Sequence, residues 1–513
     1  MFAYTATASR DLDQAAQDAG TSGFELMRRA GQAVFDEVSS RYPQAHALLV
    51  FAGKGNNGGD AYVVAGLAAL AGWQVRLWQI VGHPEQLSGE AAAAAKFALS
   101  CGVIPDQTDP VAQLQQVRDS DGNCLVIDGL FGTGLSRAPA SAVANLMTSI
   151  NESAARVVAL DVPSGLNGTS GATPGVAIRA ALTLTFIGMK LGLLTGRGPD
   201  LAGERVLVPL GVSERTRQRV AGVQVFDAPV TRLAPRQPSA YKNQFGHLLV
   251  VGGDQGSGGA IILAAEAALR SGAGLVSVAT RLHNVTPLLV RRPELMACGV
   301  EGAADLRPLL SRATLFVVGP GMGQGAWGEQ LLQLVFQHVR ASRERQPHPM
   351  PLVLDADALN LVASGMTPPR GCVMTPHPGE AARLLGCSVQ DVAADRVAAV
   401  LAIAQRYGAF VVLKGVGSLV AAPPAQAHEE ATAVPATLMG VCALGNPGMA
   451  SAGMGDVLSG IVGGLIAQEG IDGTSVARAV QVHAAAGDRA AAIHGAAGMV
   501  AADLIDCLPT VLR

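Results

Sequence analysis

Aromatic and charged residues are both scarce in this chain of 513 residues. Phe, Trp and Tyr together make up 4% and the charged residues 15%, whereas apolar residues reach 49%. A chain with so few charges and so many apolar residues can bury a large core, which excludes an intrinsically disordered protein. With 62 glycines and 28 prolines, the composition is typical of a well-buried α/β enzyme. The length exceeds what one hydrophobic core usually organises, so we expect at least two domains.

Positive charge is not in excess either. The formal net charge of −3 at pH 7 predicts no electrostatic attraction to nucleic acid or to an anionic membrane surface. No uninterrupted apolar run is long enough to span a bilayer. The first residues, MFAYTATASRDLDQAAQ, lack the basic start and the apolar core of a secretory signal. We therefore expect no nucleic-acid partner, no membrane attachment and a cytoplasmic location.

Paired cysteine motifs are missing as well. The seven cysteines form no CxxC pair and are scattered along the chain: Cys101, Cys124, Cys298, Cys372, Cys387, Cys442 and Cys507. An odd, unpatterned set in a large chain is typical of reduced, buried thiols in a cytosolic protein.

Short β-branched apolar runs alternate with helical stretches along the whole chain. This alternation predicts two three-layer α/β domains, the first with a Rossmann-like parallel sheet. The strand-like runs include HALLVFAG and ARVVALDVPSG in the first half, and FGHLLVVGG and FVVLKGVGSLV in the second. Residues 226–245 carry three prolines and no helical period, so we interpret them as the linker. The predicted domains are residues 1–225 and 230–513.

The first candidate site begins with a strand, a glycine loop and a helix. The apolar run ALLVFAG is followed by KGNNGGDAYVVAGLAAL, and the amides at the start of such a helix favour an anion, typically a phosphate. The four glycines of the loop would let the backbone bend sharply or approach a ligand closely. The loop matches neither G-x-G-x-x-G nor a Walker pattern, which argues against a standard dinucleotide site.

Polar residues also follow other strands of the first half. Asp128 and Asp161 each end an apolar run, and an open parallel sheet binds its ligands at the carboxyl ends of its strands. The residues that we expect to converge there are Asn56, Asn57, Asp60, Asp128, Asp161 and Ser164. Alternatively, each aspartate caps a helix or closes a turn, which is the commoner role. The amide, carboxylate and hydroxyl oxygens suit a hard cation, whose identity stays open.

The segments GKGNNGGD, DGLFGTGL and DVPSGLNG, in this order, resemble the NAD(P)H-hydrate epimerase domain of the YjeF N-terminal family. The likeness covers residues 1–225. It implies that the hydrated nicotinamide dinucleotide is bound by Asn56, Asn57, Gly58, Gly59, Asp60, Gly132, Thr133, Gly134, Leu135, Ser136, Arg137, Ala138 and Asp161.

The same resemblance implies a metal site and a catalytic group. A potassium ion would bind Asn57, Asp128 and Ser164, and Asp161 would transfer the proton. The chain departs from the family at two positions, with Ala61 in place of the usual glycine and Gly129 in place of the usual alanine. Both exchanges are between small residues, so the resemblance holds.

A second candidate site lies near the end of the chain, in GNPGMASAGMGDVLSGIVGGLIAQ. Six apolar residues recur there at helical spacing: Val457, Leu458, Ile461, Val462, Leu465 and Ile466. They predict a buried helix that starts close to Asp456. Glycine amides at the positive end of this helix suit a transferring phosphoryl group, and Asp456 could take a proton from a substrate hydroxyl. The alternative is an aspartate that only caps the helix.

Three more segments of the second half fit a nucleotide pocket. Lys414 and Gly415 break a strand where a phosphate or adenosine could bind, although a lone lysine is more often a surface charge. His377 stands between two prolines in a rigid polar loop, or simply packs against its turn. Asp355 and Asp357 follow another strand, either near a metal or as caps, and capping is the commoner role. Glycine loops also follow strands at residues 252–259 and 319–323.

Together these segments resemble the ADP/ATP-dependent NAD(P)H-hydrate dehydratases of the ribokinase-like superfamily. The motifs GPGMG, HPGE, KG and GMGD occur in the family's order, over residues 230–513. The resemblance implies a ribokinase-like sheet, with Asp456 as the catalytic base. Hydrate contacts would come from Ala260, Gly323, His377 and Asp456, and nucleotide contacts from Lys414, Gly415, Val416, Gly417, Ser418 and Gly455. Relatives usually carry threonine where this chain has Met454; if that hydroxyl contacts phosphate, the chain lacks a hydrogen bond worth about 1 kcal/mol.

The two resemblances together imply one bifunctional enzyme that repairs NADH hydrate and NADPH hydrate. The second half would phosphorylate the hydrate and eliminate phosphate to restore the nicotinamide, and the first half would interconvert the two epimers. The relatives imply ADP with magnesium as the first choice, ATP as possible, and a homo-oligomer. Two alternatives stay open: a ribokinase-like small-molecule kinase, and a first half that is a regulatory nucleotide-binding module without catalysis.

Overall fold

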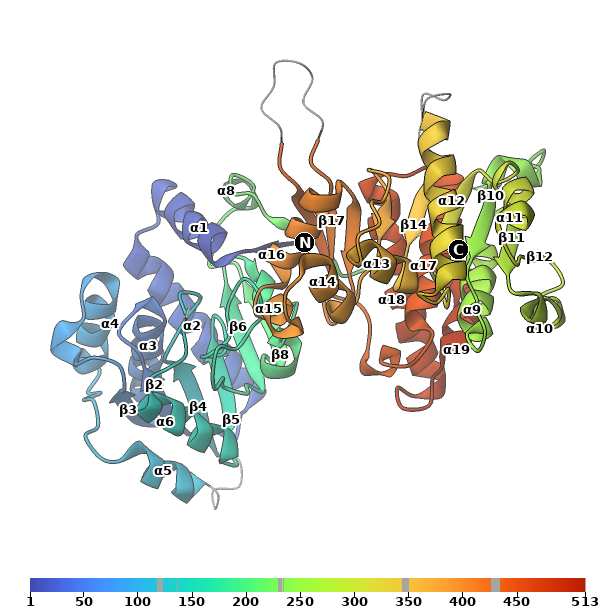
Figure 1. Cartoon of the computed structure of the whole chain (residues 1–513). Helices are drawn as coiled ribbons and strands as arrows, with labels where there is room; N and C mark the ends of the chain where they lie inside the picture. Colours follow the sequence, from blue (N-terminus) through green and yellow to red (C-terminus); the bar gives the residue numbers. More distant parts are fainter. Residues whose placement is uncertain are drawn as a thin grey trace. The chain divides into compact units, whose positions relative to one another are not determined.

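The computed structural model describes the chain except for residues 118–122, 136, 229–232, 234, 344–349, 426–433 and 513. The chain forms two compact units, Met1–Gln224 and Val225–Arg513 (Figure 1). Both units are α/β with largely parallel sheets, as the alternation of apolar runs and helical stretches predicted.

The first unit is built on a parallel sheet with the strand order β3-β2-β4-β5-β6-β8. Its strands are β2 (Ala47–Ala52), β3 (Gln74–Gln79), β4 (Cys124–Gly129), β5 (Arg156–Leu160), β6 (Leu182–Phe186) and β8 (Glu204–Val208). The chain runs from β2 outward to β3 and then returns to β4 on the other side of β2. The carboxyl ends of β2 and β4 therefore flank the point at which the strand order reverses, where doubly wound sheets bind their ligands.

Helices cover both faces of this sheet (Figure 1, blue to green). They are α1 (Ala6–Asp18), α2 (Gly23–Arg41), α3 (Asn56–Leu70), η1 (Pro84–Gln86), α4 (Gly89–Ser100), α5 (Pro110–Val117), α6 (Ser141–Glu152), η2 (Leu191–Leu193), α7 (Gly198–Leu201) and α8 (Glu214–Arg217). Alternate residues of β2 face opposite sides, as the pleat requires. Leu48 and Val50 join the core with α2, α3 and α4, while Leu49 and Phe51 join the core with Ile150 of α6.

A short ladder that is not part of this six-stranded sheet holds the start of the chain. β1 (Phe2–Tyr4) pairs in parallel with β7 (Met189–Lys190) and antiparallel with the first two residues of β9 (Val223–Phe226). The hydroxyl of Thr5 then caps α1 by accepting the amide of Ala8 at 3.1 Å. This arrangement brings α1 and Lys190 to the end of the sheet at which β5 and β6 finish.

The second unit has the strand order β12-β11-β10-β13-β14-β15-β16-β17-β18, parallel through β16, after which β17 and β18 run antiparallel to their neighbours. Its strands are β10 (His247–Val251), β11 (Leu275–Thr280), β12 (Met296–Gly299), β13 (Leu315–Val318), β14 (Leu352–Leu354), β15 (Val373–Met374), β16 (Phe410–Leu413), β17 (Ser418–Ala422) and β18 (Thr437–Cys442). The strand order reverses between β10 and β13, which run parallel, so the glycine loops that follow these two strands lie side by side.

The helices of the second unit follow the strands in the same way (Figure 1, green to red). They are η3 (Lys242–Phe245), α9 (Gly258–Arg270), η4 (Leu282–Asn284), α10 (Val285–Arg291), α11 (Ala303–Leu310), α12 (Ala326–Arg343), α13 (Ala356–Ala363), α14 (Pro378–Leu385), α15 (Val389–Ala394), α16 (Arg396–Tyr407), η5 (Pro447–Met449), α17 (Met454–Glu469), α18 (Gly473–His494) and α19 (Ala501–Val511).

α17 is the buried helix that the apolar spacing predicted. All six of its predicted core residues are buried, in one cluster with α9, α18 and α19. A Cβ on Gly460 would overlap the carbonyl oxygen of Ala264, so glycine is what allows α17 to pack so closely on α9. This packing fixes the start of α17 relative to the strand ends of the sheet.

The predicted linker holds some regular structure at its ends. β9 runs to Phe226, and η3 forms a 3-10 turn at Lys242–Phe245. Residues 229–232 and 234 of the linker lie outside the described residues. The division of the chain into functional domains at this segment stays a prediction.

Candidate active sites

A cavity of about 460 Å³ opens in the first unit at the carboxyl ends of β2, β4 and β5. It lies where the strand order reverses, which is the position that doubly wound sheets offer to a ligand. α1, α2 and β7 contribute further residues to its wall. Among its lining residues are the following that we expected to bind the hydrate: Asn56, Asn57, Asp60, Gly132, Thr133, Gly134, Leu135 and Asp161.

Most of the glycines in the loop before α3 and in its first turn are required by protein packing. A Cβ on Gly53 would overlap the carbonyl oxygen of Leu130, and a Cβ on Gly58 would overlap that of Gly53. A Cβ on Gly59 would lie 2.5 Å from a sulfur atom of α2. Around Gly55, by contrast, a Cβ would meet nothing within 4 Å among the described residues. Packing within the protein therefore accounts for three of these four glycines, and contact of the segment with a ligand stays a prediction.

The first turn of α3 faces the cavity. Lys54, Gly55 and Asn56 line the cavity at this end, and Gly55 is the N-cap of the helix. The first amides of a helix have no partners within the helix and attract an anion. This end of the cavity therefore suits a phosphate group.

Asp161 follows β5 with its backbone in the left-handed region, at a φ of 63°. Its Oδ1 accepts hydrogen bonds from the Thr185 hydroxyl at 3.3 Å and from the Phe186 amide at 3.2 Å, and it forms an ion pair with the Nζ of Lys190. Lys190 is 2% exposed and also donates to the Phe186 carbonyl at 2.7 Å. The Asp161 side chain therefore does not cap a helix; it is a carboxylate held at the cavity wall by a buried cation.

Two further carboxyl groups share this corner of the cavity. Burial raises the pKa of Asp60 well above its ordinary value, and the charges of Asp161 and Asp13 raise it further, against the effect of Lys190. Burial also raises the pKa of Asp13, on α1, to about 6, although Lys190 partly offsets it. Burial and the neighbouring carboxylates therefore favour the protonated form of Asp60, which can donate a hydrogen bond to a ligand.

Asn57, Asp128 and Ser164 meet at the loop that follows β4. Ser164 donates to Asp128 from its hydroxyl at 2.5 Å and from its amide at 2.8 Å, and Asp128 also closes its own turn by accepting the Leu130 amide at 3.3 Å. Asn57 donates from Nδ2 to the Phe131 carbonyl at 3.1 Å, while its buried Oδ1 has no hydrogen-bond partner among the described residues. Burial raises the pKa of Asp128 to about 6. An orphaned amide oxygen beside a buried carboxylate fits a hard cation such as potassium.

The other residues expected in the first site lie outside the cavity lining. Gly58 and Gly59 are buried in the packing of α3, and Arg137 and Ala138 are exposed. Ser136 lies outside the described residues. Contacts between these residues and a ligand stay a prediction.

The second site is centred on the start of α17. Gly453 is the N-cap, at a φ of 87°, so Asp456 stands in the first turn and the capping alternative is wrong. Burial raises the pKa of Asp456 to about 7; the charge of Asp355 adds to this and that of Lys414 opposes it. A carboxyl group with a pKa near neutrality is suited to accept and return a proton.

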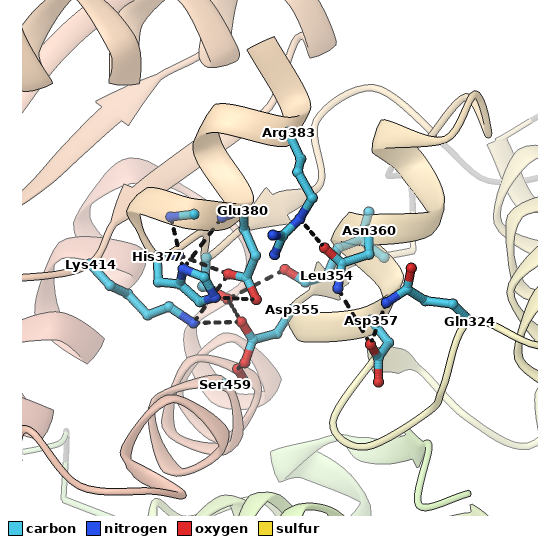
Figure 2. A network of polar contacts seen from close by, with 12 residues as sticks. Gln324, Leu354, Asp355, Asp357, Asn360, His377, Glu380, Arg383, Lys414 and Ser459 are labelled. Carbon is cyan, nitrogen blue, oxygen red and sulfur yellow. Dashed lines mark hydrogen bonds and ion pairs between the residues drawn. The ribbon is translucent and has the colours of Figure 1, made fainter. Parts of the chain in front are cut away.

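A buried ion pair lies beside this turn (Figure 2). Asp355 is 1% exposed, and its Oδ1 accepts from the Nζ of Lys414 and from the Thr375 hydroxyl, both at 2.8 Å. Its Oδ2 accepts from the Ser459 hydroxyl at 2.5 Å. Burial opposes the charged form of Lys414, but Asp355 and Glu380 outweigh it and raise the pKa of the lysine. Asp355 occupies the N-cap position of α13 without capping it, so the expected capping role is wrong.

His377 caps α14 and is half exposed. Its Nδ1 accepts the amides of Gly379 at 2.9 Å and Glu380 at 3.3 Å, and its own amide donates to the Glu380 carboxylate at 2.8 Å. Burial and the positive charges of Lys414 and Arg383 lower its pKa. The alternative that His377 packs against its turn is thus realised, and its contact with a hydrate stays a prediction.

The glycine loops after β10 and β13 lie against each other. The amide of Asp254 donates to the Gly321 carbonyl at 2.6 Å, and a Cβ on Gly321 would lie 3.2 Å from that of Ala260. Gly323 donates its amide to Oδ2 of Asp357 at 2.8 Å. The first turn of α9, with Ala260, therefore lies next to the loop that holds Gly323; both residues were expected to contact the hydrate.

The expected nucleotide residues also gather from distant segments. Lys414 starts the turn between β16 and β17, in which Gly415 and Gly417 take φ values of 127° and 62° that favour glycine. A Cβ on Gly455, in α17, would lie 3.1 Å from the Nζ of Lys414. Among the described residues, no group of three His, Cys, Asp or Glu side chains is arranged to hold a metal ion.

Comparison with known proteins decides the family. The YjeF-related N-terminal family model matches residues 23–192, and the NAD(P)H-hydrate dehydratase model matches residues 248–510. The bifunctional NAD(P)H-hydrate repair enzyme Nnr of Coxiella burnetii is 41% identical over 507 residues, which cover 98% of each chain. The Escherichia coli enzyme of the same name is 41% identical over 510 residues, covering 98% of this chain and 92% of its own. The chain belongs to the family of bifunctional NAD(P)H-hydrate repair enzymes.

This family membership confirms the bifunctional repair enzyme that the two sequence resemblances implied, in the order YjeF-like half first and dehydratase half second. A solved ADP/ATP-dependent NAD(P)H-hydrate dehydratase from Bacillus subtilis, co-crystallised with ATP and Mg²⁺, is also similar to this chain. It is 24% identical, with a TM-score of 0.45, and the match covers 55% of this chain and 93% of that chain.

In this NAD(P)H-hydrate repair enzyme, four residues near the two sites were missed by sequence reasoning. They are Asp13 and Lys190 in the first unit, and Glu380 and Ser459 in the second. Lys190 did leave a signal, because it is a single charge inside the apolar run FIGMKLGLL and a buried lysine needs a carboxylate partner. Asp13 and Ser459 lie on helices whose neighbours are set by tertiary packing, so no local pattern marks them.

The described residues also bear on the expected absence of membrane-spanning helices and on the expected state of the cysteines. None of the described helices combines the length and the apolar character needed to cross a membrane. The seven cysteines are free thiols, but the expectation that they are buried is wrong for three of them: Cys387 is exposed, and Cys101 and Cys298 are partly exposed. Burial raises the pKa of Cys372 to about 12 and those of Cys124 and Cys442 to about 11. Such thiols are unreactive at neutral pH.

Proposed function

We propose that this chain returns hydrated NADH and NADPH to the reduced cofactors in two steps. The first unit interconverts the R and S epimers of the hydrate, and the second dehydrates the S form at the expense of ADP, giving NAD(P)H, AMP and phosphate. The observation that carries the proposal is Asp456 in the first turn of α17, because its pKa is raised to about 7 in the neighbourhood of the cationic Lys414.

In the second unit, Asp456 accepts the proton of the hydrate's hydroxyl while the oxygen attacks the terminal phosphorus of the nucleotide. An O–P bond forms to the substrate, the O–P bond to the departing nucleotide breaks, and ADP leaves as AMP. The phosphate ester then loses phosphate, together with a proton from the adjacent ring carbon, and the ring double bond returns. Lys414 and the glycine amides that begin α17 neutralise the charge on the transferred group.

In the first unit, Asp161 is the proton-transfer group. The two epimers differ at the carbon that carries the hydroxyl, so a bond to that carbon must break and reform on the opposite face. In a ring-opening route, Asp161 accepts the hydroxyl proton while the bond from this carbon to the ring nitrogen breaks and the carbon becomes an aldehyde. It returns the proton to the oxygen as the nitrogen attacks the opposite face, so atoms and charge balance. Lys190 holds the carboxylate in place, and the first turn of α3 with Lys54 would bind a phosphate of the dinucleotide.

The proposal extends to ions, location and assembly. Asn57, Asp128 and Ser164 would hold potassium, which would neutralise the buried carboxylate and stabilise the loop after β4. Magnesium would bind together with the nucleotide, because phosphate oxygens and water molecules are most of the ligands of Mg²⁺ in such sites. ADP is the first choice and ATP is possible. We place the enzyme in the cytoplasm, as a homo-oligomer.

The test uses both epimers of NADPH hydrate with magnesium, potassium and either ADP or ATP, and follows the return of the reduced nicotinamide absorbance. Wild type should restore the whole pool, Asp456→Asn should restore none, and Asp161→Asn should stop when the directly usable epimer is consumed. A mixture of the two variants should restore the pool again, since each retains one activity. Asp36→Asn, an exposed acid of α2, is the matched control.

Other outcomes would favour the alternatives. If no absorbance returns with either nucleotide, the repair proposal fails, and ATP-dependent phosphorylation of an added alcohol would support a small-molecule kinase. If Asp161→Asn leaves epimer interconversion unchanged while the hydrate still binds, the first unit is a regulatory nucleotide-binding module.

A further inference from the structure

Two acids, Asp355 and Asp357, follow β14 on either side of Ala356. Ala356 has a φ of 47°, in the left-handed region. This conformation costs a non-glycine residue about 1–3 kcal/mol and persists where the surrounding contacts enforce it. The two carboxylates point to different partners (Figure 2). Strained backbone between two bonded acids is therefore a feature that the fold maintains at a cost.

Asp355 ties together three elements that carry the second site. It binds the Nζ of Lys414, at the start of the expected nucleotide loop, and the hydroxyls of Thr375 and Ser459. Ser459 lies on α17, one turn after Asp456, and its oxygen is also 3.1 Å from the carbonyl oxygen of Gly455. A buried carboxylate with three donors is fully satisfied and cannot shift without breaking them.

Asp357 binds the opposite side of the site. Its Oδ2 accepts the Gly323 amide at 2.8 Å, and its Oδ1 accepts from the Gln324 side chain at 3.3 Å. Asn360, one turn further along α13, lies 3.4 Å from the same Oδ1 and accepts from Arg383 of α14 at 2.7 Å. These bonds fix the loop after β13, which we expect to contact the hydrate.

We propose that Asp355 and Asp357 are positioning residues of the dehydration reaction. Asp355 fixes the positions of Asp456 and Lys414 relative to each other. Asp357 fixes the loop after β13, which holds Gly323, relative to these two residues. This inference rests on the proposed function of the second unit. The turn from Asp355 to Asp357 would thus align the base, the nucleotide and the hydrate. In phosphoryl transfer, such alignment supplies much of the rate enhancement.

The charges around Asp456 make the role of Asp355 measurable. After burial, the charge of Asp355 is the largest influence on the pKa of Asp456; Lys414 opposes it, and Glu380 and Asp357 add smaller effects in the same direction as Asp355. Two histidines are also near this turn: His377 beside Glu380, and His483, which binds the Met454 carbonyl and whose pKa is lowered to about 4. Removing the charge of Asp355 leaves Lys414 to favour the ionised form of Asp456.

The experiment compares three variants in the dehydration assay with the S epimer and ADP across the pH range. Asp355→Asn should move the acid limb of kcat/KM to lower pH by about one unit and lower kcat. Ser459→Ala keeps every charge but removes the hydrogen bond between Asp355 and α17. We therefore expect kcat to fall about tenfold or more, while the acid limb of the kcat/KM profile stays at the same pH. Asp357→Asn is the matched substitution on the same turn; it should raise KM for the hydrate several-fold, with a smaller pH shift than Asp355→Asn.

The outcomes separate this inference from the function on which it rests. If wild type fails to dehydrate the hydrate with either nucleotide, the proposed function is wrong. If wild type is active but Asp355→Asn has an unshifted acid limb, the positioning role is wrong. ADP-induced stabilisation checks that each variant folds. If Asp355→Asn does not fold, Ser459→Ala decides, because wild-type kcat in that variant would overturn the role of Asp355.

Discussion

Asp456→Asn should stabilise the second unit above neutral pH while it abolishes dehydration. Burial, and then the charge of Asp355, raise the pKa of Asp456 from its ordinary 3.8 to about 7 in the folded chain. When folding raises the pKa of a carboxyl group, the contribution of that group to the free energy of unfolding is largest at a pH below its unfolded pKa. Its contribution is lost as the pH rises from about 4 to about 7, because ionisation inside the protein is then required.

The size of this effect follows from the shift. Three pH units at about 1.4 kcal/mol each give an upper bound of about 4 kcal/mol at pH 8. Asparagine has nearly the shape of the protonated acid and no charge, so the variant should regain most of this stability. The gain is reduced by the loss of the attraction between Lys414 and the ionised Asp456. For a unit of this size, 1 kcal/mol corresponds to about 2–4 °C in Tm. We expect the variant to melt roughly 5–10 °C higher than wild type at pH 8, with no difference near pH 4.

The measurement is thermal unfolding of wild type and Asp456→Asn between about pH 4 and about pH 8, with and without ADP. The transition that ADP raises belongs to the second unit. Asp506→Asn, an exposed acid of the same unit, should show no pH-dependent gain. In the dehydration assay, Asp456→Asn should lose at least about a hundredfold in rate. A stability difference that is the same at both ends of the pH range would refute the raised pKa and the argument built on it.

Three further substitutions test the first unit. Lys190→Met should slow epimerisation roughly a hundredfold and spare dehydration, since Asp161 loses its buried partner; an equal loss of both activities would contradict this. Asn57→Leu should abolish any stimulation of epimerisation by potassium, measured against sodium, because the free Oδ1 is removed; an unchanged potassium dependence would count against the ion site. Gly58→Ala should lower the Tm of the first unit by several degrees, because its Cβ would overlap a backbone carbonyl. Gly55→Ala, at an open position, is its control, and equal melting temperatures would show that the packing argument is wrong.

Much of the fold was predictable because its signals are local. Short β-branched apolar runs mark the strands, and the apolar spacing from Val457 to Ile466 marks α17 as a buried helix. Acids that end such runs, such as Asp128 and Asp161, must lie at the carboxyl edge of a parallel sheet once the strands are in place. The cavity at that edge follows from the same rule.

Contacts between distant segments were not predictable in this way. Asp355 and Ser459 are 104 positions apart, and only the packing of α17 against the sheet brings their side chains to 2.5 Å. Lys190 reaches Asp161 because β7 pairs with β1, a ladder with too few residues to leave a strand pattern in the sequence. The sequence also does not show that Gly58 is crowded by the carbonyl oxygen of Gly53, because a close approach of backbone and a close approach of a ligand both call for glycine.

The sequence by itself determined the α/β class, the parallel sheets, the buried helix at Asp456 and the motifs that carry the family, because each depends on the order of apolar, polar and glycine residues over a few turns. Only the tertiary structure decided which of those polar residues share a site, which glycines serve packing, and which carboxyl groups have raised pKa values. Those properties depend on burial and on the distance between charges, and both are set by elements that meet from far apart in the chain.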